Sequence, residues 1–472
     1  MVFSSHLFLL YFLPVALLVY HTLPRRGRHL ALALLSYTFY GWANPLFVVL
    51  LLASTVVDYG CGLAIAASAR DAAGARRRRA AVAVSVVTNL SLLGFFKYFN
   101  FGIDTLNGVG AALGAEWLGL DTALRVTLPL GISFYTFQSM SYTIDVARGH
   151  AAPLRNFIDF ACYVSLFPQL VAGPIIRFAE IADQLVQRTH TAAKFARGVA
   201  FVSLGLAKKV LLANPCGRIA DLAFDAGSIA TLDAWLGLVA YAFQIYFDFS
   251  GYSDMAIGLG LMLGFVFPKN FDSPYRAESI TEFWRRWHLS LSSWLRDYLY
   301  VPLGGSRRGP RRTYINLAIV MLLGGLWHGA AWTFVCWGAL HGGLLAAERW
   351  RGGSLYAFLP APLRRGATFG LVLLSWVLFR SADLGAAAGY FRSLAGLTAA
   401  TDQARLLGQA ITEPYSLVAL TCAALVTWGA PQTWDWTRNL TGPKAATAVG
   451  LLLLAWGVLA TQAHNPFIYF IF

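Results

Sequence analysis

Residues 313–347 read TYINLAIVMLLGGLWHGAAWTFVCWGALHGGLLAA and contain no Lys, Arg, Asp or Glu. A helix needs about 20 mainly apolar residues to cross a bilayer, so this run of 35 residues is long enough for two membrane helices. Its glycines predict kinked or broken helices, which a membrane protein tolerates where neighbouring helices satisfy the backbone. The stretch therefore predicts an integral membrane protein.

The same pattern extends over the whole chain of 472 residues. Hydrophobic residues make up 57% of it and charged residues 13%, against about 25% charged residues in soluble proteins. Further charge-free runs cover residues 1–24, 29–57, 126–144, 160–176, 414–434 and 445–472. We expect an all-α polytopic membrane protein with about 10–13 membrane segments, some of them re-entrant or interfacial, in a single membrane domain spanning residues 1–472.

The net charge of +14 comes from arginines in short loops beside apolar segments, which indicates membrane topology and contact with anionic lipids, not nucleic-acid binding. The clusters Arg25–Arg28 and Arg76–Arg79 are expected on the cytoplasmic side, and the N-terminus outside. No basic residue precedes the first apolar run, which argues against a cleaved signal peptide. A loop at 101–124, with Asp104, Glu116 and Asp121, is expected outside.

Several kinds of site are not predicted. The chain has no G-x-S-x-G, H-E-x-x-H or Walker A motif, so neither a serine hydrolase, a zinc protease nor an ATPase is indicated. The five cysteines are scattered without a C-x-x-C pair and are expected to be buried, reduced thiols. We expect no metal and no bound cofactor.

The segment 271–312 is more polar than its surroundings. The pattern Ser279-Ile-Thr-Glu282 predicts a helix start, and the apolar residues that follow share one helical face. We expect an amphipathic helix on the cytoplasmic side of the membrane that ends before Pro302. His288 falls on its apolar face, where a satisfied interfacial histidine and a functional histidine are both open interpretations.

His328 is the strongest functional candidate. It is the sixteenth residue of the charge-free run, roughly 22 Å along a helix from its start, and therefore lies deep in the hydrocarbon region. An ionisable group at that depth marks a pathway or a reactive site. The alternative is a histidine that joins two helices by a hydrogen bond. Histidine can deprotonate a hydroxyl near neutral pH or carry an acyl group itself.

Asp248 and Asp254 allow two interpretations. Paired carboxylates could perform acid–base chemistry, but six residues apart they do not share a helical face. Capping at a helix break near Gly251 is the favoured reading. Gly260 and Gly264 form a small-xxx-small pattern that predicts helix packing.

At these residues the chain resembles the membrane-bound O-acyltransferase (MBOAT) family, most closely its bacterial branch of alginate O-acetyltransferase-like proteins. The resemblance runs almost from end to end. Its motifs are Met1–Ser5, Gly131–Gln138, Pro168–Arg177, Phe247–Asp254, Phe283–His288, Tyr300–Gly305, Leu322–Gly329 and Pro466–Phe470.

The resemblance implies an O-acyltransferase with helices around a central tunnel, in the bacterial inner membrane. An acetyl group would pass from a cytoplasmic thioester, acetyl-CoA or an acyl carrier, toward an exported polysaccharide such as alginate. A periplasmic or cell-surface acetyltransferase would complete delivery. His328 matches the catalytic histidine and His288 the second histidine of the family. Candidates for the donor or acceptor tunnel are Trp327, Asp254, Trp287, Arg285 and Arg286, and Arg307 and Arg308 could also attract donor phosphates.

One position departs from the family pattern. Many relatives have Asn after His-Gly-Ala, whereas this chain has Ala331, which removes a possible polar neighbour of His328. Three alternatives remain open: transfer of D-alanine or another acyl group to a cell-wall polymer, a polysaccharide or lipid transporter, and a structural subunit without activity.

Overall fold

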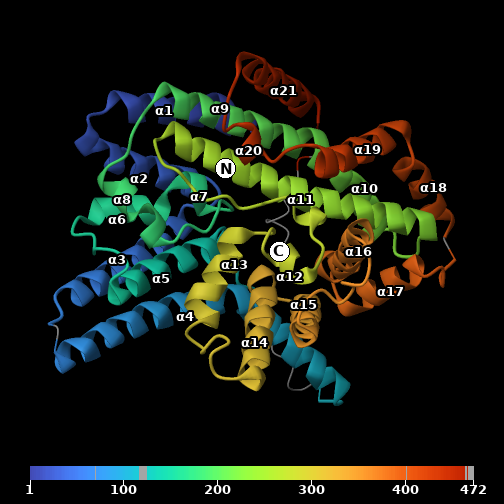
Figure 1. Cartoon of the computed structure of the whole chain (residues 1–472), viewed down its shortest axis with the longest axis horizontal. Helices are drawn as coiled ribbons and strands as arrows, with labels where there is room; N and C mark the ends of the chain where they lie inside the picture. The colour runs from blue at the N-terminus through green and yellow to red at the C-terminus, as the bar shows by residue number, and fades with distance from the viewer. Residues whose placement is uncertain (70, 116–124, 400, 463–464, 466–472) are drawn as a thin grey trace. The chain divides into compact units, whose positions relative to one another are not determined.

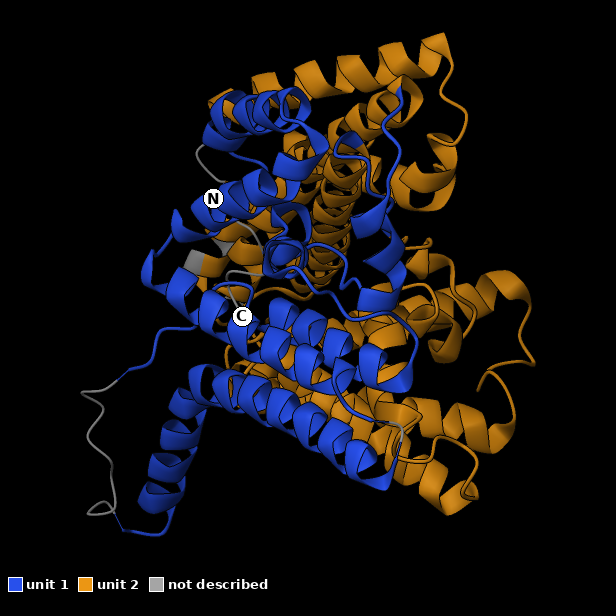
Figure 2. Cartoon of the chain, turned by 90° about the vertical axis from the view of Figure 1, so that its left-hand side faces the viewer, with its two compact units in different colours: residues 1–191, 262–267 blue, residues 192–261, 268–472 orange. Residues whose placement is uncertain are grey.

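The computed structural model describes residues 1–69, 71–115, 125–399, 401–462 and 465 (Figure 1). Every regular element in these ranges is a helix, which confirms the predicted all-α class. The chain divides into two compact units (Figure 2): unit 1 comprises Met1–Thr191 with Met262–Phe267, and unit 2 comprises Ala192–Leu261 with Pro268–Phe472. The single membrane domain over residues 1–472 remains a prediction.

Unit 1 is built from helices that follow one another closely along the chain. They are η1 (Leu7–Phe12), α1 (Leu13–Thr22), α2 (Arg25–Gly41), α3 (Leu46–Ala66), α4 (Ala72–Ala112), α5 (Ile132–Arg148), α6 (Phe157–Ser165), α7 (Phe167–Leu170) and α8 (Phe178–Val186).

Helix α4 extends into the region 101–124, where the sequence predicted a loop. Its 41 residues span roughly 60 Å, about twice the thickness of a hydrocarbon core. It begins at Asp71, whose carboxylate accepts a hydrogen bond from the Gly74 N–H at 2.7 Å. The predicted loop at 101–124 is therefore wrong for its first part, where Asp104 lies within the helix and pairs with Arg125 at 2.8 Å. Glu116 and Asp121 lie outside the described residues, as does the motif Pro466–Phe470.

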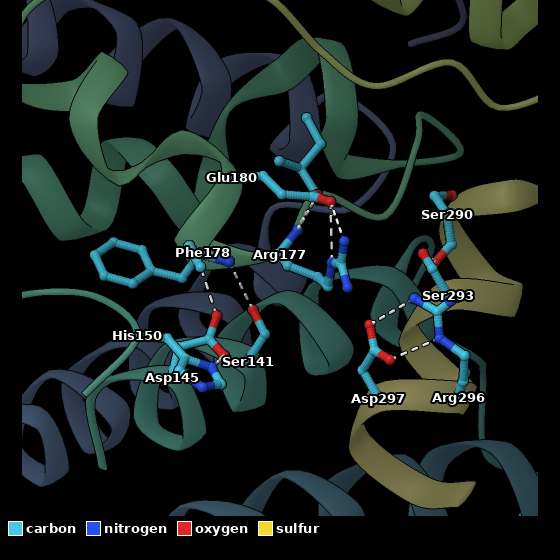
Figure 3. Close-up of polar contacts among 12 residues, drawn as sticks. Ser141, Asp145, His150, Arg177, Phe178, Glu180, Ser290, Ser293, Arg296 and Asp297 are labelled. Carbon is cyan, nitrogen blue, oxygen red and sulfur yellow. Dashed lines mark hydrogen bonds and ion pairs between the residues drawn. The ribbon is translucent and has the colours of Figure 1, made fainter. Parts of the chain in front are cut away.

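Polar contacts hold the start of α8 against α5 within unit 1 (Figure 3). Ser141 Oγ accepts from the Phe178 N–H at 3.1 Å, and Asp145 Oδ2 accepts from the Ala179 N–H at 3.1 Å. These bonds satisfy N–H groups that a helix N-terminus leaves without a partner. The residues that directly follow the motifs Gly131–Gln138 and Pro168–Arg177 thus join these two helices.

Unit 2 contains the segments that the sequence singled out for chemistry. Its helices are α9 (Ala192–Ala207), η3 (Lys208–Ala213), α10 (Asn214–Phe224), α11 (Thr231–Met262, the last residue belonging to unit 1), η4 (Pro274–Arg276), α12 (Ile280–Trp284), α13 (Leu289–Leu295), η5 (Arg296–Tyr300), α14 (Pro310–His328), α15 (Trp332–Arg351), α16 (Ala361–Arg380), α17 (Leu384–Leu394), α18 (Asp402–Ile411), α19 (Pro414–Gly429), α20 (Thr433–Trp436) and α21 (Gly442–Thr461).

The charge-free run 313–347 forms two helices, α14 and α15, which lie side by side (Figure 1). Glycines allow their backbones to approach closely. A Cβ on Gly325 would lie 2.3 Å from the Phe334 carbonyl oxygen, and one on Gly338 would lie 2.4 Å from the Met321 carbonyl oxygen. Small residues at such crossings are typical of membrane helix pairs. The two-helix interpretation of this run is confirmed.

Helix α11 is continuous, so the predicted break near Gly251 is wrong. Gly251 instead packs against α9, where a Cβ would lie 2.7 Å from the Gly205 carbonyl oxygen, and Gly258 meets the Gly198 carbonyl oxygen in the same way. These glycines serve close helix packing. The predicted pair Gly260 and Gly264 is not on one helix, because Gly264 follows the end of α11 with φ +87°.

Three helices in the described ranges are long and apolar enough to cross a membrane by length and composition alone: Leu46–Ala66, Ala72–Ala112 and Gly442–Thr461. The apolar helices Leu7–Thr22 and Pro414–Gly429 are shorter. The predicted count of about 10–13 membrane segments therefore remains a prediction.

Candidate active site

The segment 271–312 does not form the single amphipathic helix that the sequence predicted. It begins as expected, with Ser279 Oγ accepting from the Glu282 N–H at 3.0 Å. Helix α12 then ends at Trp284, and α13 starts after His288, whose backbone is left-handed with φ 44° and ψ 56°. Such a conformation costs a non-glycine residue about 1–3 kcal/mol and persists only where surrounding contacts hold it.

Two carboxylates anchor the start of this segment to α15 and α16. Glu348 accepts from the Ile280 and Thr281 N–H groups, both at 2.8 Å, which satisfies the N-terminus of α12. Glu278 forms ion pairs with Arg364 at 2.5 Å and Arg365 at 2.8 Å. The hydrogen bonds from these two arginines hold the pKa of Glu278 below its usual range.

The apolar residues of the segment are buried within the protein. Trp287 is 2% exposed, and its ring lies 5.2 Å from Trp376 and 5.6 Å from Phe283. Ile280 and Leu291 are also buried. This side of the segment therefore packs on protein, which corrects the expectation of a helix lying with its apolar face in the lipid interface.

His288 is fully buried at the turn between α12 and α13. Its Nδ1 lies 3.1 Å from Asn270 Oδ1, and its Nε2 has no hydrogen-bond partner. Its ring meets Phe249 edge to face at 4.6 Å. Sequence analysis did not identify Asn270, because nothing in the local pattern separates it from an ordinary loop asparagine.

His328 is the last residue of α14 and is 7% exposed. Aromatic rings surround it, with centroid distances of 5.0 Å to Trp327, 5.4 Å to Trp337 and 5.2 Å to Phe379. The Trp327 ring also lies 6.0 Å from the His288 ring. The structure therefore brings together the two histidines and the tryptophan that the sequence singled out. The two histidines are 40 residues apart in the sequence.

A third buried histidine, His341, provides a contrast. Its Nδ1 accepts from Trp284 Nε1–H at 3.3 Å, and its Nε2 lies 3.1 Å from Ser375 Oγ. Ser375 uses its own hydroxyl proton on the Val372 carbonyl at 2.7 Å, so His341 Nε2–H is the donor to Ser375. Both nitrogens of His341 are satisfied, which is the pattern of a structural histidine.

Both aspartates lie inside the continuous helix α11, so neither caps a helix, and both form ion pairs. Asp248 pairs with Lys209 at 2.9 Å, and Asp254 pairs with Lys208 at 2.7 Å. Asp254 also accepts from Thr433 Oγ1 at 2.7 Å. The sequence could have indicated these ion pairs, because Lys208 and Lys209 lie within the apolar run 199–213. Charged residues inside membrane segments are rare and are usually paired.

The arginine candidates differ in their surroundings. Arg286 donates to Glu282 at 2.7 Å and to the Asp272 carbonyl at 3.1 Å. These bonds join parts of the segment 271–312 to one another, so Arg286 has a structural role. Arg285, Arg307 and Arg308 are exposed. Within the following η5, Arg296 pairs with Asp297 at 2.7 Å (Figure 3).

Ala331, the departure from the family pattern, is the N-cap of α15 and has no side-chain capping bond. Asparagine is among the best N-cap residues because its side chain accepts from the first free N–H groups. An asparagine at this position would thus be placed to cap α15, a role that the sequence-based interpretation did not consider.

Among the described residues, no group of three or more His, Cys, Asp or Glu side chains is arranged to hold a metal ion. All five cysteines are free, but only Cys61, Cys162 and Cys216 are buried. Cys336 is half-buried and Cys422 exposed, so the expectation that all five are buried is wrong for these two.

Comparison with known proteins identifies the family. The family model for membrane-bound O-acyltransferases (MBOAT) matches residues 146–370. A probable alginate O-acetylase of Azotobacter vinelandii is 44% identical, and the match covers 100% of both chains. The chain belongs to the membrane-bound O-acyltransferase family. It is therefore a membrane protein and an O-acyltransferase, and falls with the alginate O-acetylase-like members of the family.

Two further relatives are less similar to this chain. A peptidoglycan O-acetyltransferase of Helicobacter pylori is 37% identical over 84% of this chain and 80% of its own length. A teichoic acid D-alanyltransferase of Streptococcus thermophilus is 30% identical over 47% of this chain and 57% of its own length.

Proposed function

We propose that the protein moves an acetyl group from a cytoplasmic thioester, acetyl-CoA, toward hydroxyl groups of an exported polysaccharide of the alginate type. The observation that carries the proposal is the pair of buried histidines, His288 and His328, with the Trp327 ring near both. The end-to-end similarity to alginate O-acetylases supports the polysaccharide as the acceptor class.

In this proposal His328 is the general base. It takes the proton of the acceptor hydroxyl as the oxygen attacks the thioester carbonyl carbon. The new C–O bond forms, the C–S bond breaks, and the leaving thiolate receives the proton, so the products are an ester and free CoA. Proton transfer by a positioned side chain typically contributes 10²–10⁴-fold to the rate. A transient acetyl-histidine is the alternative route, which labelled donor without acceptor would trap on His328.

The surroundings of His328 suit this chemistry. Its ring is enclosed by Trp327, Trp337 and Phe379, which keep bulk water away from a thioester that water could hydrolyse. Arg285, Arg307 and Arg308 are exposed and could bind the phosphates of CoA or the headgroups of anionic lipids. No bound cofactor is required, because the donor itself carries the acyl group.

The proposed setting is the bacterial inner membrane. The clusters Arg25–Arg28 and Arg76–Arg79 would face the cytoplasm and the N-terminus the outside. A periplasmic or cell-surface acetyltransferase would receive the acetyl group and complete its delivery to the polymer. Transfer of D-alanine to teichoic acid is less well supported, because the similarity to such an enzyme covers 47% of the chain.

The test measures CoA release from labelled acetyl-CoA by purified protein in lipid nanodiscs, with alginate oligosaccharides as acceptor. His328→Ala should lose about 10²–10⁴-fold in rate. The matched control is His341→Gln, which alters another buried histidine but can still bond Trp284 and Ser375, and should stay within a few-fold of the wild type. A folded His328→Ala protein with the wild-type rate would refute the role of His328. A wild type that transports oligosaccharide without consuming thioester would favour a transporter.

A further inference from the structure

The side chain of Asn270 occupies a central position beside His288. Its Oδ1 lies 3.2 Å from the Ser290 N–H nitrogen, 2.9 Å from Ser290 Oγ and 3.1 Å from His288 Nδ1. Its Nδ2 donates to Ser253 Oγ on α11 at 2.9 Å, and its backbone carbonyl accepts from the Leu289 N–H at 2.9 Å. One residue therefore fixes both the turn and the imidazole.

The orientation of the Asn270 amide follows from these partners. A backbone N–H can only donate, so the atom that faces Ser290 N must be the oxygen. Rotating the amide by 180° would place the Asn270 NH₂ group against the Ser290 N–H, two donors facing each other. The Asn270 oxygen therefore faces His288 Nδ1 as an acceptor.

This orientation determines where the imidazole carries its proton. A neutral histidine has one N–H and one lone pair, and the hydrogen bond made by one nitrogen sets the role of the other. Ser290 Oγ also lies 3.4 Å from Nδ1, but it donates its proton to Asn270 Oδ1 at 2.9 Å and so is not the donor to Nδ1. Because Asn270 Oδ1 can only accept, His288 Nδ1 must carry the hydrogen. Nε2 then holds the lone pair, and it is the nitrogen that has no partner in the buried site.

The contrast with His341 strengthens this interpretation. There, an indole N–H donates to Nδ1 and the proton sits on Nε2, so both nitrogens are engaged. His288 has the opposite tautomer and one open nitrogen. A buried polar atom without a partner costs free energy, so its presence calls for an explanation such as a reacting group.

We infer that Asn270 is a positioning residue, which fixes His288 as its Nδ1–H tautomer and thereby keeps Nε2 as a hydrogen-bond-accepting nitrogen for acyl transfer. The inference rests on the proposed function and deepens it, since it assigns His288 as a hydrogen-bond acceptor beside the general base His328. Nε2 would accept a hydrogen bond from a neighbouring hydroxyl of the acceptor sugar, which holds the reacting hydroxyl in place for His328.

Several elements face His288, among them α13, whose Ser290 Oγ lies 3.4 Å from Nδ1. Phe249 lies on α11, Trp327 on α14 and Asn270 in the connection after α11. The titratable group that acts on His288 is His328, whose positive charge would disfavour a second charge on His288.

The first test is a ¹⁵N NMR spectrum of histidine-labelled protein in nanodiscs, with His288→Gln used to assign the His288 signals. The expected spectrum shows a protonated Nδ1 and an unprotonated Nε2 for His288, and Asn270→Ala removes this preference. A wild-type His288 with its proton on Nε2 would overturn the inference. This readout does not depend on activity, so it separates failure of the inference from failure of the proposed acetyl transfer.

The second test is the pH profile of CoA release for Asn270→Asp. A carboxylate can accept the same three hydrogen bonds, so a purely structural role predicts an unchanged profile. The inference predicts that the negative charge stabilises protonated His288 and moves the acid limb of the profile up by about 1 pH unit or more. Ser290→Ala removes an Oγ that lies 3.4 Å from His288 Nδ1 and 2.9 Å from Asn270 Oδ1. Because it disturbs the same contacts without adding a charge, it is the matched control and should keep the wild-type profile. An unshifted profile for a folded Asn270→Asp protein would overturn the inference.

Discussion

Replacing Lys209 by methionine should destabilise the protein more than replacing both members of its ion pair together. Lys209 Nζ and Asp248 Oδ1 are 2.9 Å apart, and the two side chains are 3% and 1% exposed. At an effective dielectric constant of about 20, this separation corresponds to an attraction of roughly 6 kcal/mol. Desolvation costs several kcal/mol for each ion and offsets most of that attraction.

The predicted magnitudes follow from this balance. Lys209→Met leaves Asp248 as a buried carboxylate without its lysine, and Asp248→Asn leaves the lysine without its carboxylate, so each should cost about 3–5 kcal/mol. The double variant contains neither charge and should lie within about 1–2 kcal/mol of the wild type. Lys208→Met breaks the pair between Lys208 and Asp254, whose side chains are 15% and 13% exposed. Because this pair is more exposed, its loss should lower the free energy of unfolding less than Lys209→Met does.

The assay is unfolding in mixed micelles with increasing SDS, followed by tryptophan fluorescence and extrapolated to the free energy of unfolding without SDS. The four variants and the wild type are compared under one condition. A double variant that loses as much as the two single variants combined would refute the reasoning, because the cost would then come from packing and not from an unpaired buried charge.

Two further predictions concern α14 and α15. Ala331→Asn should supply the missing N-cap of α15 and raise the free energy of unfolding by about 1 kcal/mol with unchanged CoA release, as measured by the same SDS titration; no gain would contradict the capping role. Gly325→Ala should destabilise by about 1–3 kcal/mol, because its Cβ would lie 2.3 Å from the Phe334 carbonyl oxygen. Gly343→Ala, whose Cβ meets no atom within 4 Å, is its control, and equal losses for both would contradict the packing argument.

Much of the fold class follows from local properties of the sequence. The charge-free runs identify a membrane protein because the cost of placing a charge in hydrocarbon depends on the residues of that run alone. His328 was identified for the same reason. The motifs around it and around His288 led to the family without any knowledge of contacts.

The errors concern positions where distant contacts outweigh the local pattern. The sequence predicted a break in α11 at Gly251, but that glycine packs against α9 and the helix continues. It predicted one amphipathic helix over the segment after Ser279, but contacts from Asn270 hold His288 in a left-handed turn that divides it. Helical periodicity does not reveal where tertiary contacts compensate for a strained residue.

The sequence alone therefore determined the membrane class, the all-α class and the family, and it proposed His328 as the principal histidine, because each of these inferences depends on composition or on short motifs. Only the tertiary structure decided which histidine nitrogens are engaged and which charges are paired. Each of these contacts joins residues that are distant in the sequence. His288 and Asn270 are 18 residues apart, Lys208 and Asp254 are 46 apart, and Trp284 and His341 are 57 apart. A hydrogen bond is set by the positions of two groups in space, and the distance between them along the chain does not fix those positions.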